Sequence, residues 1–203
     1  MSTDGRLVKG EQTRGTILRR AADIASAEGL EGLSIGRLAT ELRISKSGVF
    51  THFGSKEELQ LATVRTAAEV FRAHVIEPAL AVPEGIGRVR ALLDAWQRYQ
   101  REPVFPGGCF FHSAMAEFDA RPGRVRDAVA ASQRDWRALV ERCLREARDL
   151  GEIEAATDVP QLAFELDALC RAGGAHALLH DDPSLYERAA RAMCTRLAAV
   201  APA

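Results

Sequence analysis

A group of small polar and basic side chains lies close together near the N-terminus: Lys46, Ser47, Thr51 and His52. Their spacing places an ammonium, two hydroxyls and an imidazole on one exposed edge of a short helix. In the DNA major groove, lysine donates to guanine acceptors, and serine or threonine hydrogen-bonds to bases or contacts methyl groups. Gly48 lets the backbone come close to a partner. We therefore predict that Lys46, Ser47, Gly48, Thr51 and His52 contact DNA.

Two short helices must position this group. Ser34 can accept a hydrogen bond from the free N–H groups that open a helix, and Leu38, Ala39 and Leu42 then recur on one face. That helix is predicted to end near Arg43. The next one, over 46–53, follows after a link too short for structure of its own, so it leaves at a steep angle. This arrangement is a helix-turn-helix.

The apolar residues of the second helix are expected to pack on the first. We assign Ile44, Val49 and Phe50 to this internal face. The polar residues then remain outside, where a DNA partner would meet them.

A third helix is predicted to begin at Ser55. Ser55-Lys56-Glu57-Glu58 is a capping box, in which the Ser55 side chain accepts from the Glu58 amide and Glu58 returns to the Ser55 amide. Lys56 has the wrong charge for a helix N-terminus, which indicates an anion nearby. A DNA phosphate would serve.

This region closely resembles the TetR/AcrR family of bacterial transcriptional regulators. The resemblance rests on the segments TRGTIL through AEG at 13–29, SIGRLA at 34–39 and SKSGVFTHFGSKEEL at 45–59. It implies an all-α fold, with a three-helix helix-turn-helix domain at 1–56 and a helical effector-binding and dimerisation domain at 57–203. It also implies a homodimer on a palindromic double-stranded operator and an unknown small-molecule effector. The family usually has Tyr, which touches a phosphate, where this chain has Phe50.

Phosphate contacts are expected from a second group of residues. These contacts fix the register on DNA without reading sequence. The charge distribution agrees, because residues 1–56 hold nine Lys or Arg against six Asp or Glu while the whole chain has a net charge of −1. A random surface asymmetry would fit these counts nearly as well. The predicted phosphate-contacting residues are Arg14, Ser34, Arg37 and Lys56.

Composition excludes several other classes. No apolar run approaches the roughly 20 residues that span a bilayer, and the N-terminus lacks the apolar stretch of a signal peptide, so we expect a cytoplasmic protein with no membrane partner. The four cysteines form no C-x-x-C pair and lie in no metal-like spacing with histidine. We therefore expect reduced thiols, no disulfide, no metal and no cofactor.

The remainder of the chain is helical in pattern, with no period-2 stretch that would make a strand. Gly151 stands in the usual C-cap position of one long helix, and Asp158 with Gln161 caps the next. The expected helices cover 55–76, 86–100, 109–120, 121–150, a segment from 158, and 183–199.

The C-terminal segment is where the family holds a small-molecule pocket. Aromatic residues at helical spacing are also ordinary core, and both interpretations stay open. His112 and His176 could add polar contacts. The candidate pocket residues are Trp96, Tyr99, Cys109, Phe110, Phe111, Met115, Phe118, Trp136 and Phe164.

Cys109 follows Gly107-Gly108 at the expected start of a helix. A helix N-terminus favours thiolate, which reacts with oxidants and electrophiles. The adjacent Phe110 and Phe111 favour the alternative, a small buried hydrophobe. The other three cysteines lie on helix stripes and are expected to be structural.

The last two helices carry small residues that let helix backbones approach closely, among them Gly173 and Ala189. The resemblance implies that they pair with their copies in a second subunit as a four-helix bundle. Packing inside one monomer fits the same residues about as well. Because two helix-turn-helix domains recognise a longer DNA site than one, we favour the dimer.

Three classes of function can be ranked. A dimeric repressor, released from its operator by a small molecule or a reactive electrophile or oxidant, accounts for most features. A constitutive or architectural DNA-binding protein accounts for the N-terminus alone. An enzyme has no support, since there is no catalytic Ser/His/Asp order, no metal-ligand cluster and no phosphate-binding glycine loop.

Overall fold

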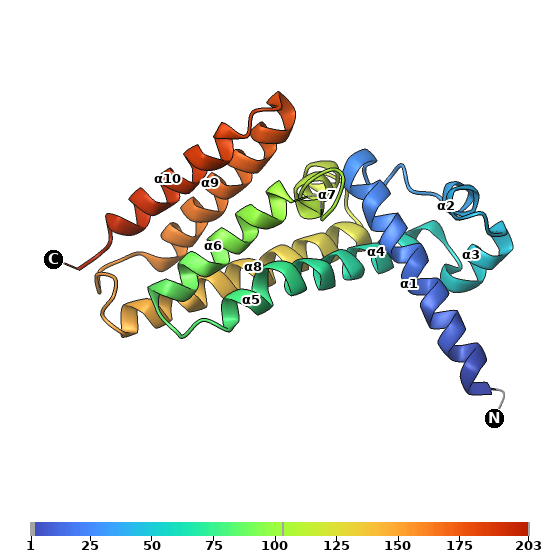
Figure 1. Cartoon of the computed structure of the whole chain (residues 1–203), viewed down its shortest axis with the longest axis horizontal. Coiled ribbons are helices and arrows are strands. Elements are labelled where there is room, and N and C mark those ends of the chain that lie inside the picture. Colours follow the sequence, from blue (N-terminus) through green and yellow to red (C-terminus); the bar gives the residue numbers. More distant parts are fainter. Residues whose placement is uncertain (1–2, 103, 203) are drawn as a thin grey trace. The chain divides into compact units, whose positions relative to one another are not determined.

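The computed structural model describes residues 3–102 and 104–202, and within them every regular element is helical (Figure 1). The predicted all-α class is therefore confirmed. The helices are α1 (Thr3–Glu28), α2 (Ile35–Leu42), α3 (Lys46–Phe53), α4 (Lys56–Phe71), the π-helix η1 (Arg72–Ile76), α5 (Glu77–Leu80), α6 (Ile86–Arg101), α7 (Phe110–Phe118), α8 (Arg124–Asp149), α9 (Val159–His180) and α10 (Ser184–Ala198).

The chain forms two compact units. The first, which we call the head unit, comprises Met1–Glu69 and Phe105–Ala130; the second, the body unit, comprises Val70–Val104 and Ala131–Ala203. The division falls inside α4 and inside α8. α7 and the turn before it therefore pack with the N-terminal helices, although they are far from them in sequence.

The helix-turn-helix forms where the sequence places it, because local caps define its ends. Ser34 Oγ accepts from Arg37 N at 3.1 Å and Ser45 Oγ accepts from Gly48 N at 3.0 Å, so each helix begins on a serine. Arg43 adopts the left-handed conformation at φ 55°, which ends α2 and turns the chain toward α3.

The core of the head unit joins α1 to the three following helices. Val49 and Phe53, four residues apart on α3, both point into it. Phe50 does not: its side chain is 55% exposed, so its expected place in the core is wrong. One residue along a helix is a turn of about 100°, which carries Phe50 from the face of Val49 to the outside. The core residues are Ile17, Leu18, Ala21, Ile24, Leu33, Leu38, Ala39, Val49, Phe53, Leu59 and Ala62.

The α4 segment begins as predicted and extends further. Ser55 Oγ accepts from Glu58 N at 3.1 Å, which is the first half of the capping box, while the Glu58 carboxylate accepts from Arg124 Nη1 at 2.7 Å. Helical structure continues beyond the expected end at residue 76, through the π-helix η1 into α5. Pro78 occupies the first turn of α5, where its missing N–H is tolerated.

α7 and the turn before it are hydrogen-bonded to the C-terminal end of α1. Gly107 N donates to Ser26 Oγ at 3.1 Å, and Ser113 Oγ donates to Ser26 O at 3.1 Å. The Glu117 carboxylate accepts from Leu30 N at 2.7 Å and from Glu31 N at 2.9 Å. Gly107 has no room for a side chain, because a Cβ there would overlap the Ser26 carbonyl. This contact, which we call the α1–α7 clasp, holds the turn that precedes α2.

An aromatic cluster forms part of the core of the body unit. Phe71, Trp96, Tyr99 and Trp136 meet edge to face, with ring centroids 5.1 Å apart for the two tryptophans and 5.3 Å apart for Phe71 and Tyr99. Trp136 Nε1 donates to Asp167 Oδ1 at 3.0 Å. Edge-to-face pairs stabilise a core beyond their buried area, so this cluster fixes α6 against α8.

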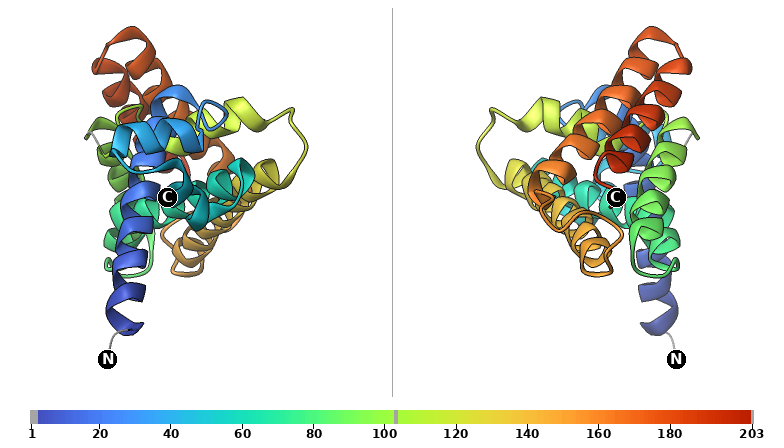
Figure 2. Two further views of the ribbon diagram at one scale, coloured as in Figure 1. Left: turned by 90° about the vertical axis from the view of Figure 1, so that its right-hand side faces the viewer. Right: turned by 90° about the vertical axis from the view of Figure 1, so that its left-hand side faces the viewer.

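α9 and α10 lie side by side, and both views of Figure 2 show them as an adjacent pair. Gly173 faces Ala189, where even a Cβ would be too close, so the two helix backbones approach tightly. Arg196 and Glu165 form an ion pair between the two helices. This pair presents one face of α9 that its own unit does not cover.

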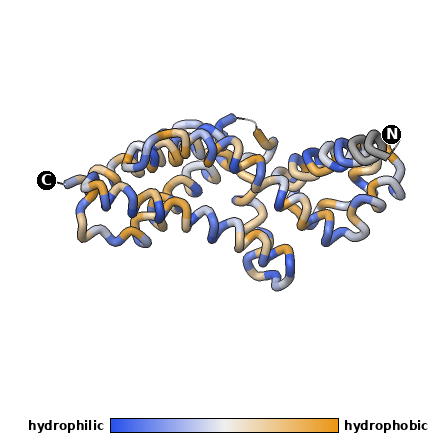
Figure 3. The backbone as a smooth tube through the Cα atoms, turned by 90° about the horizontal axis from the view of Figure 1, so that it is seen from below, coloured by the Kyte–Doolittle hydropathy of each residue, from blue (hydrophilic) through white to orange (hydrophobic). Residues whose placement is uncertain are grey.

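Hydrophobic and hydrophilic residues alternate along the helices (Figure 3). Over the residues that were described, we find no helix with an apolar stretch long enough to span a bilayer.

Candidate nucleic-acid interface

The exposed face of α3 carries most of the residues predicted to contact bases. Lys46, Ser47 and Thr51 are exposed, while Gly48 and His52 are half-buried. Thr51 Oγ1 donates to Ser47 O at 2.8 Å, and the Ser47 and Ser45 hydroxyls are 3.2 Å apart. The hydroxyls are therefore engaged locally, which leaves the Lys46 ammonium as the strong donor of this group.

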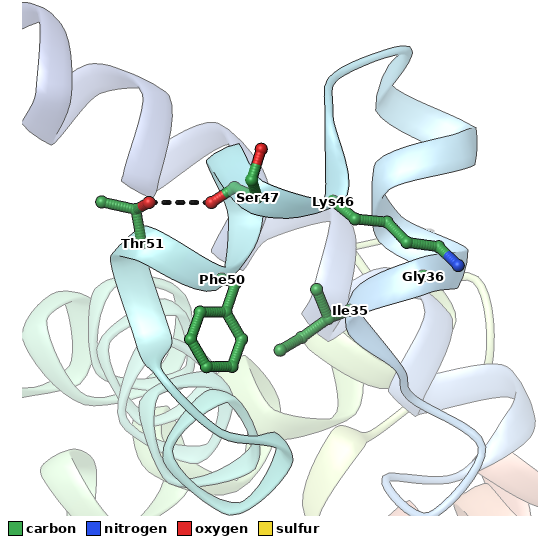
Figure 4. A pocket seen from close by; sticks show the side chains of 6 residues that line it. All are labelled: Ile35, Gly36, Lys46, Ser47, Phe50 and Thr51. Carbon is green, nitrogen blue, oxygen red and sulfur yellow. Dashed lines mark hydrogen bonds between the residues drawn. The ribbon is translucent and has the colours of Figure 1, made fainter.

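A depression of about 540 Å³ lies between α3 and the start of α2 (Figure 4). In Figure 4 the Phe50 ring lies beside the Ile35 side chain, and Lys46 extends along α2 toward Gly36. A Cβ at Gly36 would lie 3.2 Å from Lys46 Cε, so glycine gives the lysine stem its path. The lining residues are Ile35, Gly36, Lys46, Ser47, Phe50 and Thr51.

Arg37, predicted to contact phosphate, is held by two carboxylates of its own unit. It forms a bidentate pair with Glu28, and Arg37 Nε donates to Glu41 Oε1 at 3.2 Å. The hydrogen bond from Arg37 lowers the pKa of Glu28, and hydrogen bonds from Arg20 and then Arg37 lower the pKa of Glu41. Arg37 therefore ties α2 to α1, and a phosphate would have to compete with these partners.

The position of Lys56 in the first turn of α4 is explained by an intramolecular partner, without DNA. Its ammonium donates to the Glu31 carbonyl and to the Glu31 carboxylate, both at 2.7 Å. The anion predicted near Lys56 is thus the Glu31 carboxylate of the same chain. The hydrogen bond from Lys56 lowers the pKa of Glu31. The pair is largely exposed, so it contributes little to stability.

The other predicted phosphate contacts lie at helix ends or on α1. Ser34 is exposed at the N-cap of α2, beside backbone N–H groups that suit an anion. The Arg14 guanidinium lies 5.3 Å from the centroid of the Phe53 ring, and the centroid of the His52 ring lies 6.1 Å from that of Phe53. Their DNA contacts remain predictions.

Sequence reasoning missed Phe50 and Ile35 as surface residues. Both line the depression beside the predicted base-contacting group. The sequence offers a weak signal in the pair Val49 and Phe53, which are four residues apart and can share one buried face, but Phe50 and Phe53 are three residues apart and can share a face as well.

The candidate pocket residues divide between the two units. Trp96, Tyr99 and Trp136 belong to the aromatic cluster of the body unit. Phe164 belongs to the body unit but not to this cluster, because it lies on the uncovered face of α9, where its side chain is 60% exposed. The remaining candidates belong to α7 and its N-cap in the head unit: Cys109, Phe110, Phe111, Met115 and Phe118.

The cysteines differ in burial. Cys109 is the N-cap residue of α7, as expected for a thiol at a helix start, but it is only 7% exposed. Cys143 and Cys170 are buried, and burial raises the pKa of the Cys143 thiol. Cys194 is exposed, so its expected structural role within the chain is wrong. It lies on the outer side of α10, away from the stripe formed by Ala189, Met193 and Leu197.

Comparison with known proteins places this geometry in a family. The profile described as "Bacterial regulatory proteins, tetR family" matches residues 17–63, and that described as "Tetracyclin repressor-like, C-terminal domain" matches residues 85–193. The HTH-type transcriptional repressor Rv3405c of Mycobacterium tuberculosis is 32% identical over 157 residues, which are 70% of this chain and 81% of that protein.

Solved structures agree over nearly the whole chain. A TetR transcriptional regulator from Chloroflexus aurantiacus has a TM-score of 0.88 and 25% identity, covering 95% of this chain and 98% of that one. AibR, solved in complex with isovaleryl coenzyme A and operator DNA, shares the fold with a TM-score of 0.69 and 20% identity, covering 92% and 97%. The chain, with its capped helix-turn-helix and its helical C-terminal part, belongs to the TetR family of bacterial transcriptional regulators.

Proposed function

We propose that the protein is a dimeric repressor that binds a palindromic operator through α3 and leaves it when a small-molecule effector binds its C-terminal part. The observation that carries the proposal is the division of α3 into two faces. Val49 and Phe53 anchor the helix in the head core, and the opposite face presents Lys46 and Ser47 to a partner. This is the arrangement of a recognition helix that enters a major groove.

The proposal predicts binding that depends on DNA sequence. A fluorescence-anisotropy titration against DNA from the region upstream of the gene, with a scrambled duplex as control, measures it at two salt concentrations. We expect at least about a thousandfold preference for the operator, with non-specific binding that weakens steeply as salt rises. If neither this DNA nor any duplex recovered by selection from genomic fragments binds better than the scrambled control, the proposed function is wrong.

Dimerisation is proposed from the uncovered face of α9. Phe164, Ala168, Ala172 and Leu179 follow one another at intervals of four and seven residues, and all are exposed. Leu179 is 75% exposed, which is unusual for so large an apolar side chain. An exposed stripe of apolar residues, with His176 between Ala172 and Leu179, is suited to an interaction site, and a second copy of α9 and α10 would cover it.

Charge substitution in this stripe tests the dimer. We expect Phe164→Asp combined with Leu179→Asp to give a monomer at micromolar concentration, because burying two carboxylates in an apolar interface is strongly unfavourable. Sedimentation velocity measures the change in mass. Operator affinity should fall at least a hundredfold, since one head then binds one half-site without the gain from linkage.

Leu150→Asp is the matched control for this experiment. Leu150 is 59% exposed just beyond the end of α8, so it offers a comparable apolar side chain outside α9 and α10. It should leave the dimer intact. A double variant of Phe164 and Leu179 that remains dimeric would show that α9 does not form the interface.

The effector site is proposed in the body unit, at the aromatic cluster. Trp96 Nε1 is buried and has no acceptor among the residues that the structure describes. A buried donor without an acceptor is uncommon, and a ligand oxygen would satisfy it. The complex of AibR with isovaleryl coenzyme A supports the idea that this fold accommodates a small-molecule effector together with DNA.

Release would follow from a shift between two states of the dimer. The segment 105–130 packs in the head unit, yet α6 before it and α8 after it lead into the body unit. An effector that favours one position of α6 and α8 can therefore act on the α1–α7 clasp and change the separation of the two α3 helices. Both tryptophans of the chain, Trp96 and Trp136, lie in the cluster, so their fluorescence reports effector binding directly. An effector that perturbs this fluorescence but leaves operator affinity unchanged would refute the release mechanism.

A further inference from the structure

We propose that the depression between α2 and α3 receives the C5-methyl group of a thymine in each operator half-site, with Phe50 as the contacting side chain. The inference rests on the proposed DNA-binding function and goes beyond it by naming the base that the depression recognises. Its evidence is the exposure of Phe50, the chemistry of the lining and the position of Lys46.

Phe50 is an aromatic ring held open to solvent on an otherwise polar helix face. Its neighbours Val49 and Phe53 are buried, so the core has been filled without it. Ile35, the first residue of α2, lies beside the ring and is half-buried (Figure 4). The two side chains together make an apolar surface where α3 would meet DNA.

The lining has little with which to hydrogen-bond a ligand. Thr51 uses its hydroxyl hydrogen on Ser47 O, and Ser47 is paired with the hydroxyl of the N-cap Ser45. Lys46 alone supplies a strong donor, at one side of the depression. A partner for this surface therefore needs an apolar group next to a hydrogen-bond acceptor.

The major groove offers that combination. Its one apolar group is the thymine C5-methyl, while guanine presents the O6 and N7 acceptors that suit lysine. Phe50 has no hydroxyl and cannot bond a phosphate, so its favourable contact in the groove is with a methyl group. Lys46 extends toward Gly36, where a Cβ would lie 3.5 Å from Lys46 Nζ, so the ammonium lies at the α2 side of the depression that Phe50 and Ile35 also line. The geometry thus points to a thymine adjacent to the guanine that Lys46 contacts.

Replacing thymine with deoxyuracil tests the inference, because it removes only the methyl group. Each thymine of the operator is replaced in turn, symmetrically in both half-sites, and the Kd is measured by anisotropy. We expect one symmetric position to weaken binding about fourfold for one half-site and about fifteenfold for both, as for the loss of a buried methyl group. A scan without any such position overturns the inference, while the operator binding itself still stands.

The Phe50→Ala variant links the methyl to the side chain. Because Phe50 is exposed, the variant should fold normally, and thermal unfolding confirms this before binding is measured. We expect Phe50→Ala to bind thymine and uracil operators equally, whereas Leu150→Ala, another exposed apolar residue, retains the full difference. A Phe50→Ala protein that still distinguishes the two operators would show that another residue reads the methyl.

A third measurement tests whether the methyl group is recognised when it is carried by a different base. At the sensitive position, cytosine and 5-methylcytosine are compared in place of thymine. The methylated base should bind about fourfold more tightly per half-site with the unaltered protein and no more tightly with Phe50→Ala. Equal affinity for the two cytosines would mean that the loss seen with deoxyuracil does not come from a contact between the protein and the methyl group, contrary to the inference.

Discussion

Replacing Lys46 with alanine should lower operator affinity at least about thirtyfold while leaving binding to a scrambled duplex nearly unchanged. Lys46 is the strong donor among the residues that line the depression, and the loss of a specific base contact costs about 1–3 kcal/mol in each half-site. Because the proposed dimer makes the contact twice, the two losses add. Anisotropy titrations against the operator, the scrambled duplex and operators altered at single guanines measure the change.

Lys56→Ala is the matched control, since it also removes one lysine per subunit from the head unit. Its ammonium is bonded to Glu31, away from the depression, so it has no base to read. We expect Lys56→Ala to weaken operator and scrambled DNA by the same small factor and to reduce the salt dependence by at most about one ion per subunit. Equal losses for both variants on both duplexes would contradict the assignment of Lys46 to base contact.

The second large effect concerns stability. We expect Gly107→Ala to lower the free energy of unfolding of the head unit by about 2–4 kcal/mol, through overpacking and the loss of a hydrogen bond. A Cβ at Gly107 would overlap the Ser26 carbonyl and lie 2.6 Å from Ala27 Cα, so the turn must leave α1 and Gly107 N must leave Ser26 Oγ. Circular dichroism during thermal unfolding measures the shift.

Gly15→Ala on α1 is the control, because it makes the same substitution at a glycine that has room for a side chain. Gly15 is an exposed helical residue, and nothing lies within 4 Å of the position of its Cβ. Alanine there should stabilise the protein by about 0.5–1 kcal/mol, the usual difference in helix propensity. If Gly107→Ala unfolds at the same temperature as the unaltered protein, the turn before α7 is not clasped to α1.

The same variant connects stability with regulation. The α1–α7 clasp also includes Glu117, which accepts from two backbone amides of the turn before α2. Loosening the clasp at Gly107 should therefore weaken the coupling between effector and operator more than it weakens operator binding itself. Titrations of Gly107→Ala with and without effector give that coupling as a ratio of two affinities.

Several features of the recognition region could be predicted from short stretches of sequence. Ser34 and Ser45 begin helices because each hydroxyl accepts an amide three residues later, and Asp158 does the same for Gln161. Such caps involve neighbours in the chain, so their chemistry is visible in the sequence. The bounds of α3 follow from its cap at one end and Gly54 at the other.

The partners of the charged residues could not be predicted in this way. The sequence suggests DNA phosphates as the partners of Lys56 and Arg37, and in the structure each contacts a glutamate that only folding brings near. Glu31 is 25 residues from Lys56, and Glu28 belongs to another helix than Arg37. Phe50 and Phe53 are the same residue type three positions apart, and packing against α1 decides which one is buried. A pattern of apolar residues does not by itself choose between two overlapping faces.

The all-α class and the helix-turn-helix can be predicted from the sequence alone, because capping and helical periodicity act over about four residues. The resemblance to the family rests on the segments at 13–29, 34–39 and 45–59. Other features follow only from packing. It placed Phe50 and Ile35 on the surface that faces the proposed DNA, joined α7 to α1, and left a stripe of α9 uncovered. These outcomes depend on side chains that are distant in the chain and meet only in the packed molecule, where shape and burial select among partners that the sequence alone leaves equivalent.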